Sequence, residues 1–224
     1  METKKKETKK WSLMLLSAKE YLYLYEVNQL QEYSRTLERL LKGAVQDLQI
    51  RNDVRAQPLS EDDKAQLNEW YFEQHTELSE TYPSILRESL FVSSYSLIES
   101  LAFKICDHAK EMNNIRLSVK DLNGNGLKQC HTYLTKVVGL DQLQNNLHYS
   151  QLSFLSHIRN ALVHNQGTLR DADKFEAQLK QWDSVSLNQS GGILLSKDFN
   201  EKMLSHIRGF GLDIFVALRE SFGR

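Results

Sequence analysis

Apolar residues recur at steps of three and four along most of the chain, a spacing that is typical of amphipathic helices. The pattern predicts helices over residues 11–55, 60–80, 84–112, 127–138, 151–166 and 196–222. In the last of these the inward positions are apolar throughout: Phe199, Met203, Ile207, Phe210, Ile214, Phe215 and Leu218. Only two prolines and ten glycines occur in 224 residues, which agrees with long helices and few tight turns. We therefore expect an all-α fold, a bundle of long helices.

Three stretches interrupt this pattern. Tyr82-Pro83 predicts a break between two helices, with Ser84 capping the second. Asp121–Gly126 has the composition of a turn, but it lacks the preceding strand and the Lys-Ser/Thr pair of a phosphate-binding loop. Two brief alternating runs flank Gln-Ser-Gly-Gly within residues 185–195, and they predict one small β-hairpin near the C-terminus.

The helix over residues 151–166 combines an apolar stripe with a dense polar cluster. The stripe consists of Phe154, Leu155, Ile158, Ala161 and Leu162. Ser150 or Ser153 is expected to cap its start, and Gly167 to end it. The polar cluster consists of His157, Arg159, Asn160 and His164. One reading of these polar residues is a solvated helix face, and the other is a functional site.

The segment Arg159–His164 has the form Arg-Asn-x-x-x-His and resembles the Arg-x4–6-His motif of HEPN domains. HEPN domains are helical, and many of them are metal-independent ribonucleases. The resemblance covers this segment, the helix that carries Glu99 and the general helical layout. It suggests a HEPN-like domain over residues 84–224. Residues 1–80, whose long first helix the motif does not imply, would then form an N-terminal helical extension. The alternative is one continuous domain.

The resemblance also implies an activity. Arg159, Asn160 and His164 would be catalytic, RNA would be the substrate, and no cofactor or metal would be required. Family members typically form the active site at the interface of a homodimer, and a role as a toxin or defence effector with an inhibitory protein partner would fit. One competing hypothesis is a non-catalytic HEPN-like module that binds a protein partner or a nucleotide, and another is an unrelated helical scaffold in which the motif is a coincidence.

Helix geometry limits what one copy of the motif can do. At about 100° per residue, Arg159 and His164 lie about 140° apart around an ideal helix, so they flank the polar face instead of sharing one direction. Asn160 and His164 are four residues apart and do share a face, with His157 one turn earlier. Either the helix ends or distorts near His164, or a second copy of the helix completes the site across a two-fold axis.

Glu99 stands inside the apolar arc of the helix over residues 84–112. A buried carboxylate requires a partner or a raised pKa. We expect Glu99 to face and orient Arg159 or His164. The alternative is that it reaches solvent or pairs with a surface base such as Lys104.

The chemistry of RNA cleavage assigns a role to each motif residue. The pKa of histidine is close to neutral, so His164 suits proton transfer. Arg159 suits a phosphate, because its charge is permanent and its donors form a fixed fork. Asn160 would fix the histidine tautomer or the phosphate. His157 could be a second base, a substrate contact or a structural residue, and we expect the structural role. The products would be a 2′,3′-cyclic phosphate and a 5′-hydroxyl.

Bulk composition narrows the class of protein further. Lys and Arg number 28 and Asp and Glu 29, a balance that argues against a general nucleic-acid coat protein but permits a local phosphate site. Cys106 and Cys130 lie on separate apolar segments and are expected to be buried thiols in a reducing compartment. No spacing of Cys and His suggests a zinc site, and no long uninterrupted apolar run predicts a membrane span. We expect a cytoplasmic location.

Overall fold

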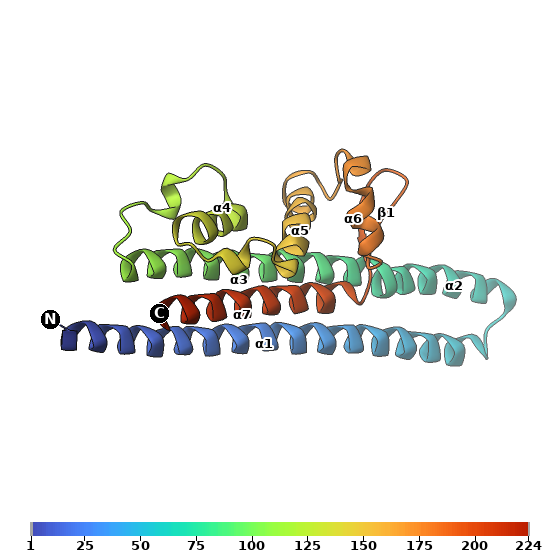
Figure 1. Ribbon diagram of the computed structural model, residues 1–224. Coiled ribbons are helices and arrows are strands. Elements are labelled where there is room, and N and C mark those ends of the chain that lie inside the picture. Colours follow the sequence, from blue (N-terminus) through green and yellow to red (C-terminus); the bar gives the residue numbers. More distant parts are fainter. Residues whose placement is uncertain (1, 224) are drawn as a thin grey trace.

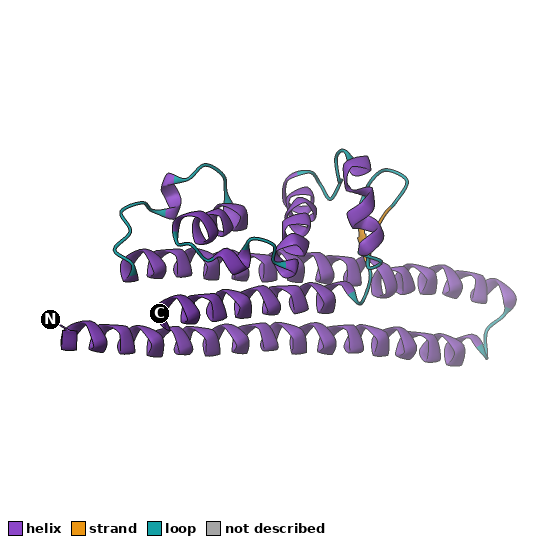
Figure 2. Cartoon of the chain, viewed as in Figure 1, coloured by secondary structure: helices purple, strands orange, loops and turns teal. Residues whose placement is uncertain are grey.

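The computed structural model describes the backbone of residues 2–223 and the side chains of residues 14–221. Three long helices lie side by side: α1 (Glu2–Ala56), α3 (Tyr82–Met112) and α7 (Phe199–Gly223). α1 runs antiparallel to the other two (Figure 1). The described chain is helical apart from its loops and one two-stranded sheet (Figure 2). The predicted all-α bundle with a small hairpin near the C-terminus is confirmed.

The break predicted at Tyr82-Pro83 is wrong. α2 (Glu61–Thr76) continues through a π turn, η1 (Glu77–Thr81), into α3. At the junction the Tyr82 N–H donates to the carbonyl of Glu77, five residues earlier. The wider turn makes room for the Pro83 ring, which would otherwise clash with a carbonyl four residues back. Ser84 does not cap a helix, because its hydroxyl donates to the Glu88 carboxylate at 2.8 Å.

The shorter elements pack together along one side of α3 and α7 (Figure 1). In chain order they are η2 (Val119–Asp121), α4 (Gly126–Thr132), the π turn η3 (Tyr133–Val137), η4 (Asp141–Leu143), α5 (Leu147–His164), η5 (Ala172–Phe175) and α6 (Glu176–Gln181). The hairpin follows, with β1 (Val185–Leu187) antiparallel to β2 (Ile193–Leu195).

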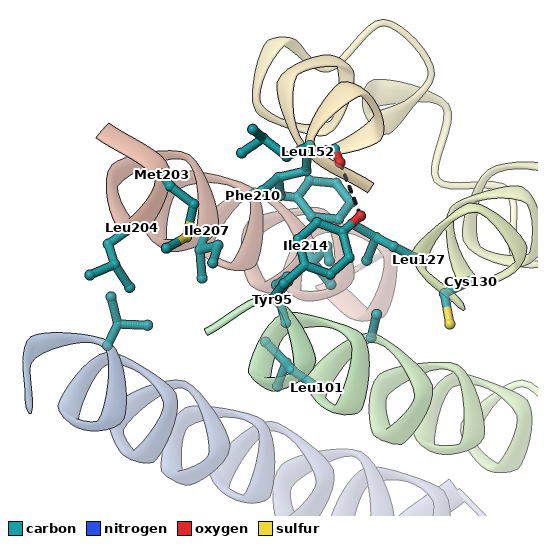
Figure 3. Close-up of a cluster of buried hydrophobic side chains, with 14 of the residues drawn as sticks. Tyr95, Leu101, Leu127, Cys130, Leu152, Met203, Leu204, Ile207, Phe210 and Ile214 are labelled. Atoms are coloured by element: carbon teal, nitrogen blue, oxygen red, sulfur yellow. Dashed lines mark hydrogen bonds between the residues drawn. The ribbon is translucent and has the colours of Figure 1, made fainter. Parts of the chain in front are cut away.

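One hydrophobic core joins α1, α3, α5 and α7. Figure 3 shows part of it, including Leu204 and Ile207 of α7 and Leu101 of α3. The seven residues predicted to face inward on α7 are all fully buried. α1 contributes Leu16, Tyr23 and Val27 to the same core, so residues 14–80 and 84–221 are packed against each other. The division of the chain at residues 80–84 stays a prediction.

Two half-buried ion pairs fix α1 against its neighbours. Arg87 of α3 donates to both carboxylate oxygens of Glu38, at 2.6 and 2.9 Å, and also to the carbonyl of Leu195 at 3.1 Å. Arg219 of α7 forms a second pair with Glu20. A bidentate Arg–carboxylate pair restricts both position and orientation, so Arg87 ties α1, α3 and the hairpin together.

The far end of α1 and the whole of α2 form a two-helix arm that extends beyond α6 and α7 (Figure 1). No described residue of α2 is buried. The Arg55 guanidinium lies 5.7 Å from the centre of the Trp70 ring across the arm. The arm is therefore held by surface contacts more than by a core of its own.

The continuous helix Glu61–Met112 is long and apolar enough to cross a membrane by length and composition, which is weak evidence for a span. Half of its most apolar window is buried inside the protein, as in the core helix of a soluble protein. The cytoplasmic location stays a prediction. Cys106 and Cys130 are buried in the core as free thiols.

Candidate functional site

α5 carries the motif, and its two ends are well defined. Its N-cap is Asn146, whose Oδ1 accepts a hydrogen bond from the Tyr149 N–H at 2.8 Å. The prediction that Ser150 or Ser153 caps this helix is wrong, because the helix begins earlier, at Leu147, whose exposed side chain lies outside the buried stripe from which the start was predicted. At the other end Gln166 and Gly167 have φ +52° and +75°, and the Gly167 N–H donates to the carbonyl of Ala161 at 3.0 Å, so the chain leaves the helix here through a left-handed turn.

The apolar stripe of α5 faces the core, so its polar residues are held at a fixed angle. Phe154, Leu155, Ile158 and Ala161 are buried. The Tyr95 hydroxyl of α3 donates to the carbonyl of Leu152 at 2.9 Å (Figure 3). Because this bond crosses from α3 to α5, the two helices that carry Glu99 and Arg159 are locked together.

A cavity of about 510 Å³ opens where α3, α5 and the start of α4 meet. We call it the Arg159 pocket. Its lining consists of Tyr95, Glu99, Asn125, Gly126, Leu127, Lys128, Tyr149, Ser153, Ser156, His157, Arg159 and Asn160. The structure thus brings together four of the five residues singled out from the sequence, namely Glu99, His157, Arg159 and Asn160.

Arg159 is half-buried at the wall of this pocket. Its Nη1 donates to Asn160 Oδ1 at 3.1 Å, and its Nε is buried without a hydrogen-bond partner among the described residues. A buried N–H of this kind retains the capacity to donate to an acceptor that enters the pocket. Asn160 therefore holds part of the guanidinium in place and leaves other donors available.

Glu99 lies in the same pocket but forms no salt bridge within the described part of the chain. Its carboxylate packs against the backbone of Gly126, where an added Cβ would collide with Oε1. Gly126 also has φ +54°, a conformation that other residues adopt at a cost. Of the two partners expected for Glu99, Arg159 shares its pocket and His164 does not.

His164 stands apart from the pocket. It is the last residue of α5 and is exposed, and it is absent from the pocket lining. α5 is helical up to this residue, so no distortion carries its imidazole around to Arg159. A single chain therefore presents Arg159, Asn160 and His157 to one cavity and His164 to solvent.

His157 is exposed at the mouth of the Arg159 pocket. Its ring lies 4.7 Å from that of Phe175, centre to centre. A structural role is expected for His157 from the sequence, yet this histidine lines the same pocket as Arg159, Asn160 and Lys128. Spacing alone could not distinguish these roles, because Phe175 and the pocket wall come from other segments.

Several residues of the Arg159 pocket could not be assigned to it from the sequence. Asn125 and Lys128 come from the turn and first residues of α4, a stretch that does not have the pattern of a phosphate-binding loop. Lys128 is exposed and adds a second cation beside Arg159. Only the packing of α4 against α3 brings it there, so no local pattern could have revealed it.

The aromatic wall of the pocket is rigid. The ring of Tyr149 stacks on His131 with the ring centres 3.5 Å apart and the planes 3° from parallel. His131 Nε2 lies 2.8 Å from the carbonyl of Leu143, and burial lowers the pKa of His131. The imidazole is therefore neutral near pH 7 and donates to this carbonyl. Burial, with the negative charge of Glu99 second, raises the pKa of Tyr95, so its phenol stays protonated.

Among the described residues, no three His, Cys, Asp or Glu side chains gather to hold a metal ion. Comparison with models of protein families, with curated proteins and with solved structures found no match to this chain. The motif and the geometry of the Arg159 pocket are therefore the features from which a function can be inferred.

Proposed function

We propose that this chain is a metal-independent endoribonuclease of the HEPN type that acts as a homodimer. The observation that supports this proposal is that Arg159, the motif arginine, lies in a cavity with Asn160, Lys128 and His157. Two cations, a carboxamide and an imidazole are suitable groups for binding a phosphodiester and moving protons around it.

In this proposal Arg159 binds the scissile phosphate. The 2′-hydroxyl loses its proton and attacks phosphorus, the bond to the 5′-oxygen breaks, and that oxygen gains a proton. The products are a 2′,3′-cyclic phosphate and a 5′-hydroxyl. Arg159 and Lys128 stabilise the charge on the phosphorane, and a histidine transfers the protons.

The homodimer supplies the histidine. Because His164 points away from the Arg159 pocket of its own chain, we assign it to the pocket of a second copy. Two α5 helices facing each other across a two-fold axis would bring each His164 toward the other copy's Arg159. His157 would then contact substrate at the mouth of the pocket.

The test is cleavage of total RNA in excess EDTA, with analysis of the new ends. We expect wild-type protein to leave 2′,3′-cyclic phosphates. Arg159→Ala and His164→Ala should each lower the rate about 100-fold or more. His75→Ala, a histidine change on the remote α2, is the control and should leave the rate unchanged.

Mixing the two inactive variants tests the shared site. If Arg159 and His164 act across the interface, a heterodimer of Arg159→Ala and His164→Ala keeps one intact site of two. Statistical exchange of subunits would then restore about a quarter of wild-type activity. Mixing that restores nothing, with each variant dimeric, would refute the shared site.

The exposed position of His164 favours one alternative function, a non-catalytic module that binds a nucleotide in the Arg159 pocket. This alternative predicts nucleotide binding that Arg159→Ala abolishes, with no cleavage of RNA by the wild-type protein. Full cleavage by His164→Ala would also exclude the proposed mechanism.

A further inference from the structure

A second cavity, of about 610 Å³, adjoins the Arg159 pocket along α5. The two cavities share Tyr149, Ser153 and His157. Its other walls are the loop before α5 and the side of η5 and α6. A ligand that fills both cavities would therefore extend from the side chain of Arg159, past His157, into the second cavity.

Primary carboxamides dominate this second cavity, which we call the amide pocket. Six of its lining residues are Asn or Gln: Gln144, Asn145, Asn146, Gln151, Gln178 and Gln181. None of its lining residues is Asp, Glu, Lys or Arg. Each carboxamide offers both a donor and an acceptor, so the pocket is suited to a neutral group that has both.

Internal hydrogen bonds engage only half of these carboxamides. Gln151 Oε1 accepts from the Trp182 indole at 2.6 Å, Asn146 caps α5, and Gln144 donates to Asp141. Among the described residues, no hydrogen bond is found for the side chains of Asn145, Gln178 or Gln181, and all three are exposed. These three are therefore available to a ligand without loss of an existing bond.

An aromatic surface completes the amide pocket. Phe175 is half-buried, and its ring centre lies 4.7 Å from that of His157. On the buried side, the ring centre of Phe154 lies 6.0 Å from that of Phe175. Planar aromatic groups stack with nucleobases, and Asn and Gln side chains hydrogen-bond to base edges.

We propose that the amide pocket binds an unpaired nucleobase of the RNA next to the phosphate held by Arg159. This inference rests on the proposed function, and it adds the feature that would select the cleaved sequence. The base contacts Phe175 and hydrogen-bonds with Gln178 and Gln181, while its ribose lies near His157. Neutral donors and acceptors match a base, whereas the charged groups are confined to the Arg159 pocket.

Binding of small probes to the full-length protein tests the inference without requiring catalysis. The probes are the four nucleoside 5′-monophosphates and ribose 5-phosphate. Their binding is measured by calorimetry or from changes in the amide NMR spectra of isotope-labelled protein. We expect at least one nucleotide to bind about tenfold or more tightly than ribose 5-phosphate. The Gln178→Ala/Gln181→Ala double variant should lose that advantage and keep its affinity for ribose 5-phosphate.

Two matched controls make the result specific. Gln189→Ala changes an exposed glutamine of the hairpin, outside both cavities, and should leave all affinities as in wild type. Arg159→Ala should weaken nucleotides and ribose 5-phosphate together. Thermal denaturation of each variant confirms that it is folded, which is expected because Gln178 and Gln181 are exposed.

The outcomes separate this inference from the proposed function. Nucleotides that bind no more tightly than ribose 5-phosphate would overturn the base subsite even if RNA is cleaved. Preferential binding of a neutral disaccharide such as maltose in the amide pocket would also overturn it. Base-dependent binding that the double variant abolishes would support the subsite even if no RNA is cleaved, in which case only the nuclease proposal fails.

Discussion

At the scale of single residues, the Arg159 pocket depends on a few side chains whose positions are fixed by hydrogen bonds or by ring stacking. Asn160 holds Nη1 of Arg159, Tyr95 joins α3 to α5, and His131 supports the ring of Tyr149. The Tyr95 hydrogen bond is buried and the His131 stack is half-buried, whereas the Asn160 hydrogen bond is exposed. The pocket is therefore shaped before any ligand arrives, which lowers the ordering cost of binding.

Removal of the Tyr95 hydroxyl tests this support. Tyr95→Phe deletes the bond to the Leu152 carbonyl and keeps the ring in the core. We expect the free energy of unfolding to fall by about 1 kcal/mol, measured by urea denaturation. The control is Tyr21→Phe, since Tyr21 is 70% exposed, and it should change stability little. Equal stability of Tyr95→Phe and wild type would contradict the role of this bond.

His206 makes stability depend on pH. Burial, and then the neighbouring charge of His148, lower the pKa of His206, and the two Nδ1 atoms lie 3.1 Å apart. A histidine with a lowered folded-state pKa binds protons more readily when unfolded. The contribution of neutral His206 to the free energy of unfolding is therefore fully present above the unfolded pKa of about 6.5 and is lost as the pH falls below that value.

We accordingly expect the free energy of unfolding to decrease between pH 7.5 and pH 5.5. Lowered pKa values of His108 and His131, both chiefly caused by burial, act in the same direction. His206→Gln removes one titrating group, so its stability should depend less steeply on pH. Identical pH slopes for the variant and wild type in chemical denaturation would refute the contribution of His206.

At the scale of elements, α5 is the decisive helix because both cavities run along it. Its position follows from its cap and its buried stripe. Asn146 contributes twice, since Oδ1 caps the helix and Nδ2 donates to Asp213 of α7 at 2.7 Å. The start of the motif helix is thereby attached to the central helix of the bundle.

Replacement of the cap should weaken this attachment. We expect Asn146→Ala to lower the free energy of unfolding by about 1 kcal/mol or more. Asn146→Asp retains a capping oxygen but places a carboxylate beside Asp213. Ser150→Ala is the control, because Ser150 is exposed in the second turn. If Ser150→Ala destabilises the protein as much as Asn146→Ala, the cap assigned by the structure is wrong.

Sequence periodicity identified the long helices and the hairpin, since apolar spacing reflects burial directly. The predicted break at Tyr82-Pro83 is absent, because a π turn accommodates a proline that would normally end a helix. Periodicity also placed the cap of α5 too late, because the helix begins at Leu147, outside the buried stripe from which the start was predicted. Both errors concern local geometry that depends on tertiary packing.

The candidate site was predictable only in part. The motif and Glu99 stood out by residue type and periodicity, and the Arg159 pocket includes Glu99, Arg159 and Asn160. Lys128 and the carboxamides of α6 belong to segments whose local patterns indicate only turns and a polar helix. Their contribution arises from contacts between elements distant in sequence, which no single-segment pattern encodes.

At the scale of the whole molecule, three long helices form a platform for the smaller elements (Figure 1). The smaller elements line both cavities, and α3 adds Tyr95 and Glu99 to the Arg159 pocket. α5 keeps an exposed side that includes Val163, 44% exposed, and His164. A two-fold pairing of α5 with α5 would cover this side. The platform and the arm would remain outside such an interface.

A charge placed at Val163 should therefore separate the copies. We expect wild-type protein to have twice the 26.0 kDa mass of one chain in light scattering, and Val163→Glu to have the mass of one chain. Val216→Glu is a matched control, because Val216 lies on α7 and is 43% exposed. A monomeric wild type, or dissociation by Val216→Glu alone, would refute pairing through α5.

The contact between Glu99 and Gly126 has a consequence for how this sequence can diverge. A side chain at position 126 would displace the Glu99 carboxylate and also strain a backbone with positive φ. Relatives of this chain that keep a glutamate at the position of Glu99 should therefore keep a glycine at the position of Gly126. Loss of the glutamate removes the contact but leaves the positive φ, so replacements at the position of Gly126 in such lineages should be confined to residues that tolerate this conformation, chiefly Asn and Asp.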